Sequence, residues 1–315
     1  MSAPADSLAV RLRDGRRLAY RCVGPPDGML VLYLHGAIGS PQTVSPELEA
    51  VVGELDVRYV MVSRPGFGGS DRLARRTMLS FADDVAQLAD ELGSERFAVV
   101  GVSTGGPYAL ACAHELSQRV PAAAVVSCMS GAGGGSWGSQ LAVGLPLRVL
   151  RRRPRTCTYA ADALLALLAR HPRLAERVMQ TAAASAHRHV LAPSEARELA
   201  LSRFRAAARR GVGGMIDDYL LCAAPWDFDP GGVRALVQLW HGMRDVLVPV
   251  DQARSSSPPR CRTSRRGWIP TRATSSIAGG CARSSETSSA PSDHRASAPA
   301  APERRAHVTP RAAGA

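Results

Sequence analysis

The chain has 315 residues and a net charge of +12, and all 39 of its basic residues are arginine. Because arginine codons are mostly GC-rich and lysine codons are not, we interpret this bias as genome composition. No aromatic residues alternate with the arginines to stack on bases, so we expect no nucleic-acid partner.

No apolar run reaches the length of about 18 residues that a membrane span needs, and the first residues lack a secretion signal, which predicts a cytoplasmic protein with no membrane partner. The seven cysteines are scattered without a C-x-x-C pair, which indicates neither a disulfide framework nor a metal site.

The first part of the chain alternates strand-like and helical patterns. Residues 8–12 and 17–23 flank an Asp-Gly turn, which predicts a β-hairpin. Continuous apolar runs that each end in glycine, as buried parallel strands do, cover residues 29–36, 57–66, 96–106 and 122–131. Between the second and third runs, residues 80–93 have helical spacing, with Ser80 as N-cap and Gly93 as C-cap. The alternation predicts an α/β fold with a doubly wound, mostly parallel sheet.

The rest of the chain divides into three sections of different composition. Residues 133–230 are Ala- and Arg-rich helical stretches, which predict a helical cap inserted between a first core part, 1–132, and a second, 231–254. The second core part contains one more strand pattern. Residues 255–315 contain no Leu or Phe, one Val and two Ile, too little apolar surface to offset the entropy of ordering, so we expect a disordered tail.

The segment GVSTGG, residues 101–106, places a G-x-S-x-G motif between a buried strand and a helix. Gly101 and Gly105 suit a sharp strand-to-helix turn that leaves no room for side chains. Ser103 would then project from a strained backbone as a candidate nucleophile, and the amide of Thr104 at the helix start would face a developing oxyanion. The other interpretation is a glycine-rich turn with an incidental serine.

An earlier loop, with the sequence LHGAIGS, follows the strand that we expect beside the nucleophile. The amide of Ala37 is the candidate second oxyanion donor. His35 is either a base or a structural histidine that, with Gly36, holds this loop. We favour the structural role, because a base follows the acid in chains of the order Ser, Asp, His. In the next motif, SRPGFGGSD, Arg64 and Asp71 are expected to brace a loop near the site.

Taken together, LHG, RPGFGGS, GVSTGG and LWHGMRDVLVP, in this order and spacing, resemble the α/β-hydrolase superfamily over residues 10–254. The resemblance implies a serine hydrolase with residues 133–230 as its cap and no metal or other cofactor. It also implies that the catalytic acid is Asp245, after the last strand pattern. The other interpretation of Asp245 is a solvated aspartate in a turn.

The catalytic histidine that the resemblance implies is missing. In such hydrolases a Gly-His pair follows the acid by about 25 to 30 residues, as the fold's last catalytic motif. Here His294 and His307 are the only histidines after His241, and both lie in the low-complexity tail.

The genetic code offers an explanation for the missing histidine. Read out of frame, GWIPTRATSS permits the sequence D-P-D-A-G-H-L, with the histidine arising across Ala273 and Thr274, 28 residues after Asp245. We therefore hypothesise that the reading frame was lost near Arg254. The other interpretation is a genuine, divergent tail.

Two functions of different classes follow from these features. The first is a serine hydrolase that acts on a small ester or related acyl substrate, impaired by the loss of its histidine. The second is a hydrolase-fold protein that binds a small ligand without turnover. The substrate and the oligomeric state cannot be predicted from this sequence.

Overall fold

The computed structural model describes residues 8–37, 46–73, 75–129, 149–171, 173–174, 211–242, 245, 248 and 265–269. Its strands are β1 (Leu8–Arg11), β2 (Arg17–Val23), β3 (Met29–Leu34), β4 (Val57–Val62), β5 (Ala98–Val102), β6 (Ala122–Val126), β7 (Leu236–Gly242) and β8 (Arg265–Ile269). Its helices are α1 (Pro46–Glu54), α2 (Met78–Glu91), α3 (Gly105–Glu115), α5 (Pro154–Arg170), α8 (Gly213–Cys222) and the short 3₁₀ helix η1 (Pro230–Gly232).

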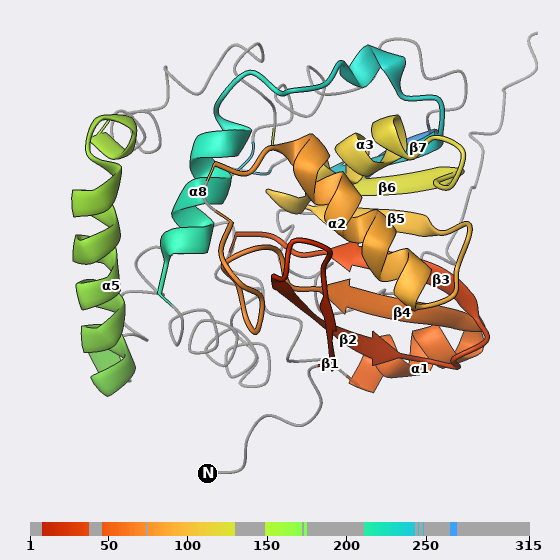
Figure 1. Ribbon diagram of the computed structural model, residues 1–315, viewed down its shortest axis with the longest axis horizontal. Coiled ribbons are helices and arrows are strands. Elements are labelled where there is room, and N and C mark those ends of the chain that lie inside the picture. The colour runs from red at the N-terminus through yellow and green to blue at the C-terminus, as the bar shows by residue number, and fades with distance from the viewer. Residues whose placement is uncertain are drawn as a thin grey trace, which may run out of the picture. The chain divides into compact units, whose positions relative to one another are not determined.

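The strands form one eight-stranded sheet in the order β1-β2-β4-β3-β5-β6-β7-β8. Figure 1 labels the strands β1 to β7 of this sheet. The β1–β2 and β2–β4 pairs are antiparallel, and every pair from β4 to β8 is parallel. The predicted doubly wound, mostly parallel α/β sheet is therefore confirmed. The strand order reverses direction between β3 and β5, and open α/β sheets bind ligands beyond the carboxyl ends of their strands at such a switch point.

The core lies between the parallel strands and the helices that cover them. The strand residues Leu32, Leu34, Val60, Val62 and Val99 are fully buried, as expected of strands covered on both faces. Helix α3 packs on β5 and β6 and lies against α2, whose buried side is apolar apart from Asp84. Each large apolar side chain buried in this way contributes about 2 kcal/mol to folding.

Helix α2 begins three residues earlier than the sequence predicts. Thr77 is its N-cap: the Thr77 hydroxyl accepts from the Ser80 amide at 3.0 Å, and the Ser80 hydroxyl accepts from the Thr77 amide at 2.9 Å. The prediction of Ser80 as the N-cap is wrong, because Ser80 is instead the reciprocal partner in a capping box. The carboxylate of Asp227, which is 149 residues from Met78, accepts from the next two amides. At the other end the C-cap is Leu92, and Gly93 follows with a φ of +70°.

The predicted disordered tail requires one correction. Residues Arg265–Ile269 form β8, which pairs in parallel with β7 from Gln238–Arg265 to Gly242–Ile269. Disorder does not hold for these five residues. A sheet edge offers unpaired backbone groups to any chain that can extend along it, so pairing does not require an apolar core-facing sequence. The rest of the predicted tail lies outside the described residues.

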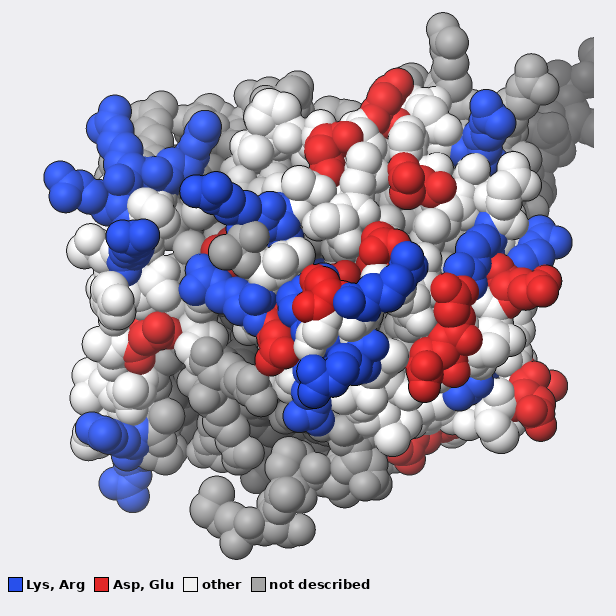
Figure 2. Space-filling model, viewed as in Figure 1, with Lys and Arg blue, Asp and Glu red and all other residues white. Residues whose placement is uncertain are grey.

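Two helices, α5 and α8, lie within the section predicted to be a cap, and in the described part of residues 149–229 there is no strand. They are tied together where the Asp162 carboxylate of α5 accepts from the Val212 amide at 2.6 Å. Figure 2 shows basic side chains over α5, and acidic and basic side chains mixed over the core. Among the described residues, no helix is long and apolar enough to cross a membrane.

Candidate active site

Ser103 lies in the turn between β5 and α3, at the carboxyl end of β5. Its φ is +54°, a left-handed conformation that a non-glycine residue adopts only where its surroundings impose it. The surroundings are hydrogen bonds on both sides: the Ser103 amide donates to the Val126 carbonyl at 2.9 Å, and the Ser103 carbonyl accepts from the Gly106 amide at 3.0 Å. The turn thus holds Ser103 at the switch point of the sheet.

The glycines beside Ser103 allow three pieces of backbone to approach closely. A Cβ on Gly101 would lie 2.7 Å from the Cβ of Ala109, and one on Gly105 would overlap the carbonyl oxygen of Leu34 at the end of β3. No side chain fits at either position. The start of α3 therefore sits directly against the end of β3, next to the loop that carries the candidate second oxyanion donor.

That loop lies over the serine. A Cβ on Gly36 would be 3.3 Å from the Cβ of Ser103 and 4.0 Å from its Oγ. Ala37 follows and is buried. On the other side, Thr104 is fully buried as the N-cap of α3 and makes no side-chain cap, so its hydroxyl serves another partner. The two segments that carry the candidate oxyanion donors thus flank Ser103, where the helix start favours negative charge.

His35 is buried, and both of its ring nitrogens have backbone partners. Nδ1 lies 2.7 Å from the Gly36 carbonyl, which can only accept, so Nδ1 carries the proton. Nε2 accepts from the Arg64 amide at 3.4 Å. Burial and the nearby Arg64 guanidinium lower the pKa of His35 to about 3, so the ring is neutral at neutral pH. With both nitrogens occupied, His35 has none left to accept the proton of Ser103.

Asp245 lies beyond the carboxyl end of β7, two strands from β5. Its Oδ1 accepts from the Val248 amide at 3.0 Å, its own amide donates to the Gly242 carbonyl at 3.1 Å, and the residue is only 7% exposed. Such burial does not fit the solvated turn that the sequence left open. Its Oδ2 lies 3.7 Å from Nε2 of His241, which donates to the Val248 carbonyl at 2.7 Å.

The described residues do not supply a histidine after Asp245. His294 and His307 lie outside them. Before Asp245, His241 is buried under the acid, and His114 packs against Phe228 with ring centroids 5.5 Å apart. The base is therefore not identified in the described part of the chain. In the same part, no group of three or more His, Cys, Asp or Glu side chains could hold a metal ion.

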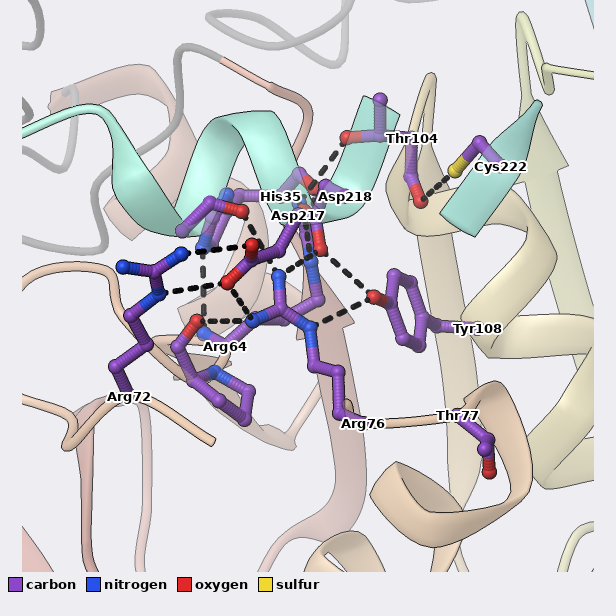
Figure 3. Close-up of polar contacts among 12 residues, drawn as sticks. His35, Arg64, Arg72, Arg76, Thr77, Thr104, Tyr108, Asp217, Asp218 and Cys222 are labelled. Carbon is purple, nitrogen blue, oxygen red and sulfur yellow. Dashed lines mark hydrogen bonds and ion pairs between the residues drawn. The ribbon is translucent and has the colours of Figure 1, made fainter. Parts of the chain in front are cut away.

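A buried ion cluster that reaches Thr104, the residue after Ser103, was not foreseen in the sequence (Figure 3). The Arg64 guanidinium donates to Asp218 Oδ2 through Nε at 2.9 Å and through Nη2 at 2.6 Å, and both side chains are fully buried. On the other carboxylate oxygen, Oδ1 accepts from Arg76 Nη2 at 2.5 Å and from the Tyr108 hydroxyl at 2.7 Å. Asp218 belongs to α8, so this cluster joins the predicted cap to the core.

The charges of the cluster stabilise one another. Burial alone would raise the pKa of Asp218, but attraction by Arg64 and Arg76 outweighs it and holds that pKa below the usual value. Burial likewise raises the pKa of the Tyr108 hydroxyl, with the Asp218 charge adding to the effect. A signal for Asp218 does exist in the sequence: Gly214, Asp218 and Cys222 are four apart on one buried face of α8, where a carboxylate needs a partner.

The chain belongs to the alpha/beta hydrolase fold family, whose model matches residues 30–220. Solved structures with the same fold include an enol-lactonase from Burkholderia xenovorans (TM-score 0.62, 17% identity, covering 86% of this chain and 94% of that one). A thermophilic esterase from Thermogutta terrifontis is similar too (TM-score 0.58, 18% identity, 85% and 90% covered). The family and these neighbours support a hydrolase-type enzyme.

A curated relative matches over a shorter stretch. The dihydrolipoyllysine-residue acetyltransferase component of an acetoin cleaving system from Cupriavidus necator is 36% identical over 115 residues, 36% of this chain. The match spans 30% of that relative's length.

Proposed function

We propose that this protein is a serine hydrolase that acts on a small ester or related acyl substrate, with Ser103 as the nucleophile. The observation that carries the proposal is the left-handed Ser103, with a φ of +54°, at the carboxyl end of β5 and under Gly36. Strained backbone of this kind is concentrated at functional sites. Esterases and a lactonase among the structural neighbours agree with acyl chemistry but, at their low identity, do not specify a substrate.

In the proposed reaction, Ser103 Oγ attacks the acyl carbonyl carbon while a histidine takes the hydroxyl proton. The carbonyl electron pair moves to its oxygen, and the Ala37 and Thr104 amides bind the resulting oxyanion. Collapse of this intermediate expels the alcohol, which takes the proton back from the histidine. Water then repeats the sequence on the acyl-enzyme and releases the carboxylic acid. Asp245 orients the histidine, and no cofactor takes part.

The histidine itself belongs, in this proposal, to the segment that follows Asp245, and a frame lost near Arg254 accounts for its absence. Without it, the chain as written retains only the contribution of the oxyanion donors, about 10³- to 10⁴-fold over the uncatalysed rate. The absence of a described histidine after Asp245 is also the one observation that favours the second candidate function, a hydrolase-fold protein that binds a small ligand without turnover.

Paired expression of the chain as written and of a version with a single-base correction near codon 254 tests the proposal. We expect turnover of p-nitrophenyl acetate in the corrected chain, and a panel of acyl lengths then defines the substrate class. Ser103→Ala in the corrected chain is expected to lower kcat by about 10⁴-fold or more. Ser127→Ala is the matched control, because Ser127 also has a positive φ, of 49°, at the end of the neighbouring strand β6.

The outcomes separate the two functions. Activity of Ser103→Ala within tenfold of the parent would contradict the assignment of the nucleophile. A corrected chain that binds p-nitrophenyl esters without hydrolysing them would favour the ligand-binding protein. A chain as written that already turns over at tens per second would show that the base is one of the tail histidines.

A further inference from the structure

The Arg64 guanidinium connects both segments that carry the candidate oxyanion donors. Its Nη1 donates to the His35 carbonyl, two residues before Ala37, and its Nη2 donates to the Thr104 hydroxyl at 3.1 Å. Its backbone amide also donates to the His35 ring. A guanidinium is planar, so these bonds fix the direction in which it can lie between the two segments.

The position of Arg64 is in turn determined by a carboxylate from the predicted cap. Asp218 is 154 residues from Arg64 and binds it through two nitrogens of the fork. Helix α8 can bring Asp218 this close because its Gly214 meets Gly66, where a Cβ on either glycine would lie within 3.0 Å of the other backbone. In Figure 1, α8 lies at the end of the sheet toward which the parallel strands point.

We propose that Asp218 is a positioning residue for the oxyanion hole: by holding Arg64, it fixes the His35–Ala37 loop and the Thr104 turn relative to each other. The inference rests on the proposed function, since the oxyanion hole matters only if Ser103 attacks an acyl group. Preorganised donors stabilise a transition state because they need no rearrangement when charge develops, so a loosened hole lowers kcat more than it weakens substrate binding.

The neighbouring residue supplies a matched control. Asp217 pairs with Arg72 at 2.7 and 2.8 Å, again across two nitrogens of one guanidinium, and it also ties α8 to the loop after β4. Arg72 is half exposed and Asp217 is 23% exposed. Asp217 also lies 3.5 Å from Arg76 Nη1, but its ion pairs reach neither Arg64 nor Thr104. Asp217→Asn and Asp218→Asn therefore make the same chemical change one residue apart, but only the second change releases Arg64.

The experiment measures kcat and KM for p-nitrophenyl acetate in the frame-corrected chain, and hydrogen exchange by mass spectrometry in peptides covering residues 30–37 and 101–106. We expect Asp218→Asn to lower kcat by about 10²-fold, the usual order for loss of one oxyanion donor, with KM changed less than threefold. Exchange in both peptides should quicken. Asp217→Asn should leave kcat within threefold and exchange in both peptides unchanged.

Thr104→Val keeps the amide and removes only the hydroxyl that Arg64 bonds, so it tests the same bridge if Asp218→Asn fails to fold. We expect a kcat loss of about tenfold with KM unchanged. Equal effects of the Asp217 and Asp218 variants, or a loss confined to KM, would overturn the proposal. If the corrected chain shows no turnover, the proposed function fails, and unchanged exchange in Asp218→Asn would then separately overturn the positioning role.

Discussion

The two sides of the candidate site differ in how completely their polar groups are paired. On the nucleophile side, Arg64, Asp218 and Thr104 form a fully buried network in which each charge faces an opposite charge or a hydrogen-bond partner. On the acid side, Asp245 lies over His241, whose Nδ1 is buried without a hydrogen-bond partner among the described residues. The nucleophile side is preorganised, whereas on the acid side the described residues include no histidine that follows Asp245 in the chain.

We expect the largest loss of activity from a substitution at Asp245. In the frame-corrected chain, Asp245→Asn should lower kcat by about 10⁴-fold, as expected when the residue that orients a catalytic histidine loses its charge. In the chain as written, where the only histidines after Asp245 are His294 and His307 of the low-complexity tail, the same substitution should change the residual activity less than threefold. Steady-state kinetics of the four proteins checks this. A large effect in both frames would mean that Asp245 acts without the missing histidine.

The next effect concerns stability on the nucleophile side. Asp218→Ala should cost about 3 to 5 kcal/mol of unfolding free energy, because it leaves two buried guanidiniums without their shared carboxylate. Asp217→Ala should cost less, about 1 kcal/mol, because Arg72 is half exposed and Arg76, the other partner of Asp217, keeps its bond to Asp218. Urea unfolding of both variants measures the difference. Similar costs would show that burial does not distinguish the two pairs.

A smaller effect is expected from pH. The folded-state pKa of His35 is about 3 and its ordinary value is 6.5, so the unfolded chain takes up the proton first as pH falls. Stability from the neutral ring is complete above pH 6.5 and is lost as the pH falls toward the folded-state value, by about 2 kcal/mol at pH 5. Urea titrations at pH 7 and pH 5 measure this loss. His35→Asn, which keeps a side-chain donor, should remove that part of the pH dependence of stability. An unaltered pH dependence would show that His35 is not the group responsible.

The smallest effect lies outside both regions. Thr77→Ala removes the N-cap of α2 and should cost about 1 kcal/mol of unfolding free energy with kcat unchanged. Denaturant unfolding and steady-state kinetics on the same preparation check it. Thr77→Ala thus serves as a control for the effect of lower stability on kcat. If this loss of unfolding free energy already lowered kcat, the lower kcat of Asp218→Asn would no longer indicate a positioning role.

Much of the fold could be predicted because its signals are local. The runs of apolar residues that end in glycine correspond to β3, β4, β5 and β6, and the glycines around Ser103 mark a turn that only residues without a Cβ can make. The predicted start of α2 was wrong because Thr77 and Ser80 both suit an N-cap. The choice between them also involves Asp227, whose carboxylate accepts from the Met78 amide. Asp227 is 149 residues away from Met78, so no local sequence pattern indicates this contact.

Residues close together in the sequence therefore specify most of the sheet, the position of Ser103 at the end of β5 and the loop that faces it, because strand burial and tight turns depend on neighbouring residues. Contacts between distant parts of the chain, by contrast, bring Asp218 to Arg64 and add Arg265–Ile269 to the sheet. A buried carboxylate is stable only where distant guanidiniums surround it, and a strand at a sheet edge pairs through backbone groups that every sequence carries. Neither the surrounding guanidiniums nor the free sheet edge can be recognised from the residues that are close by in sequence.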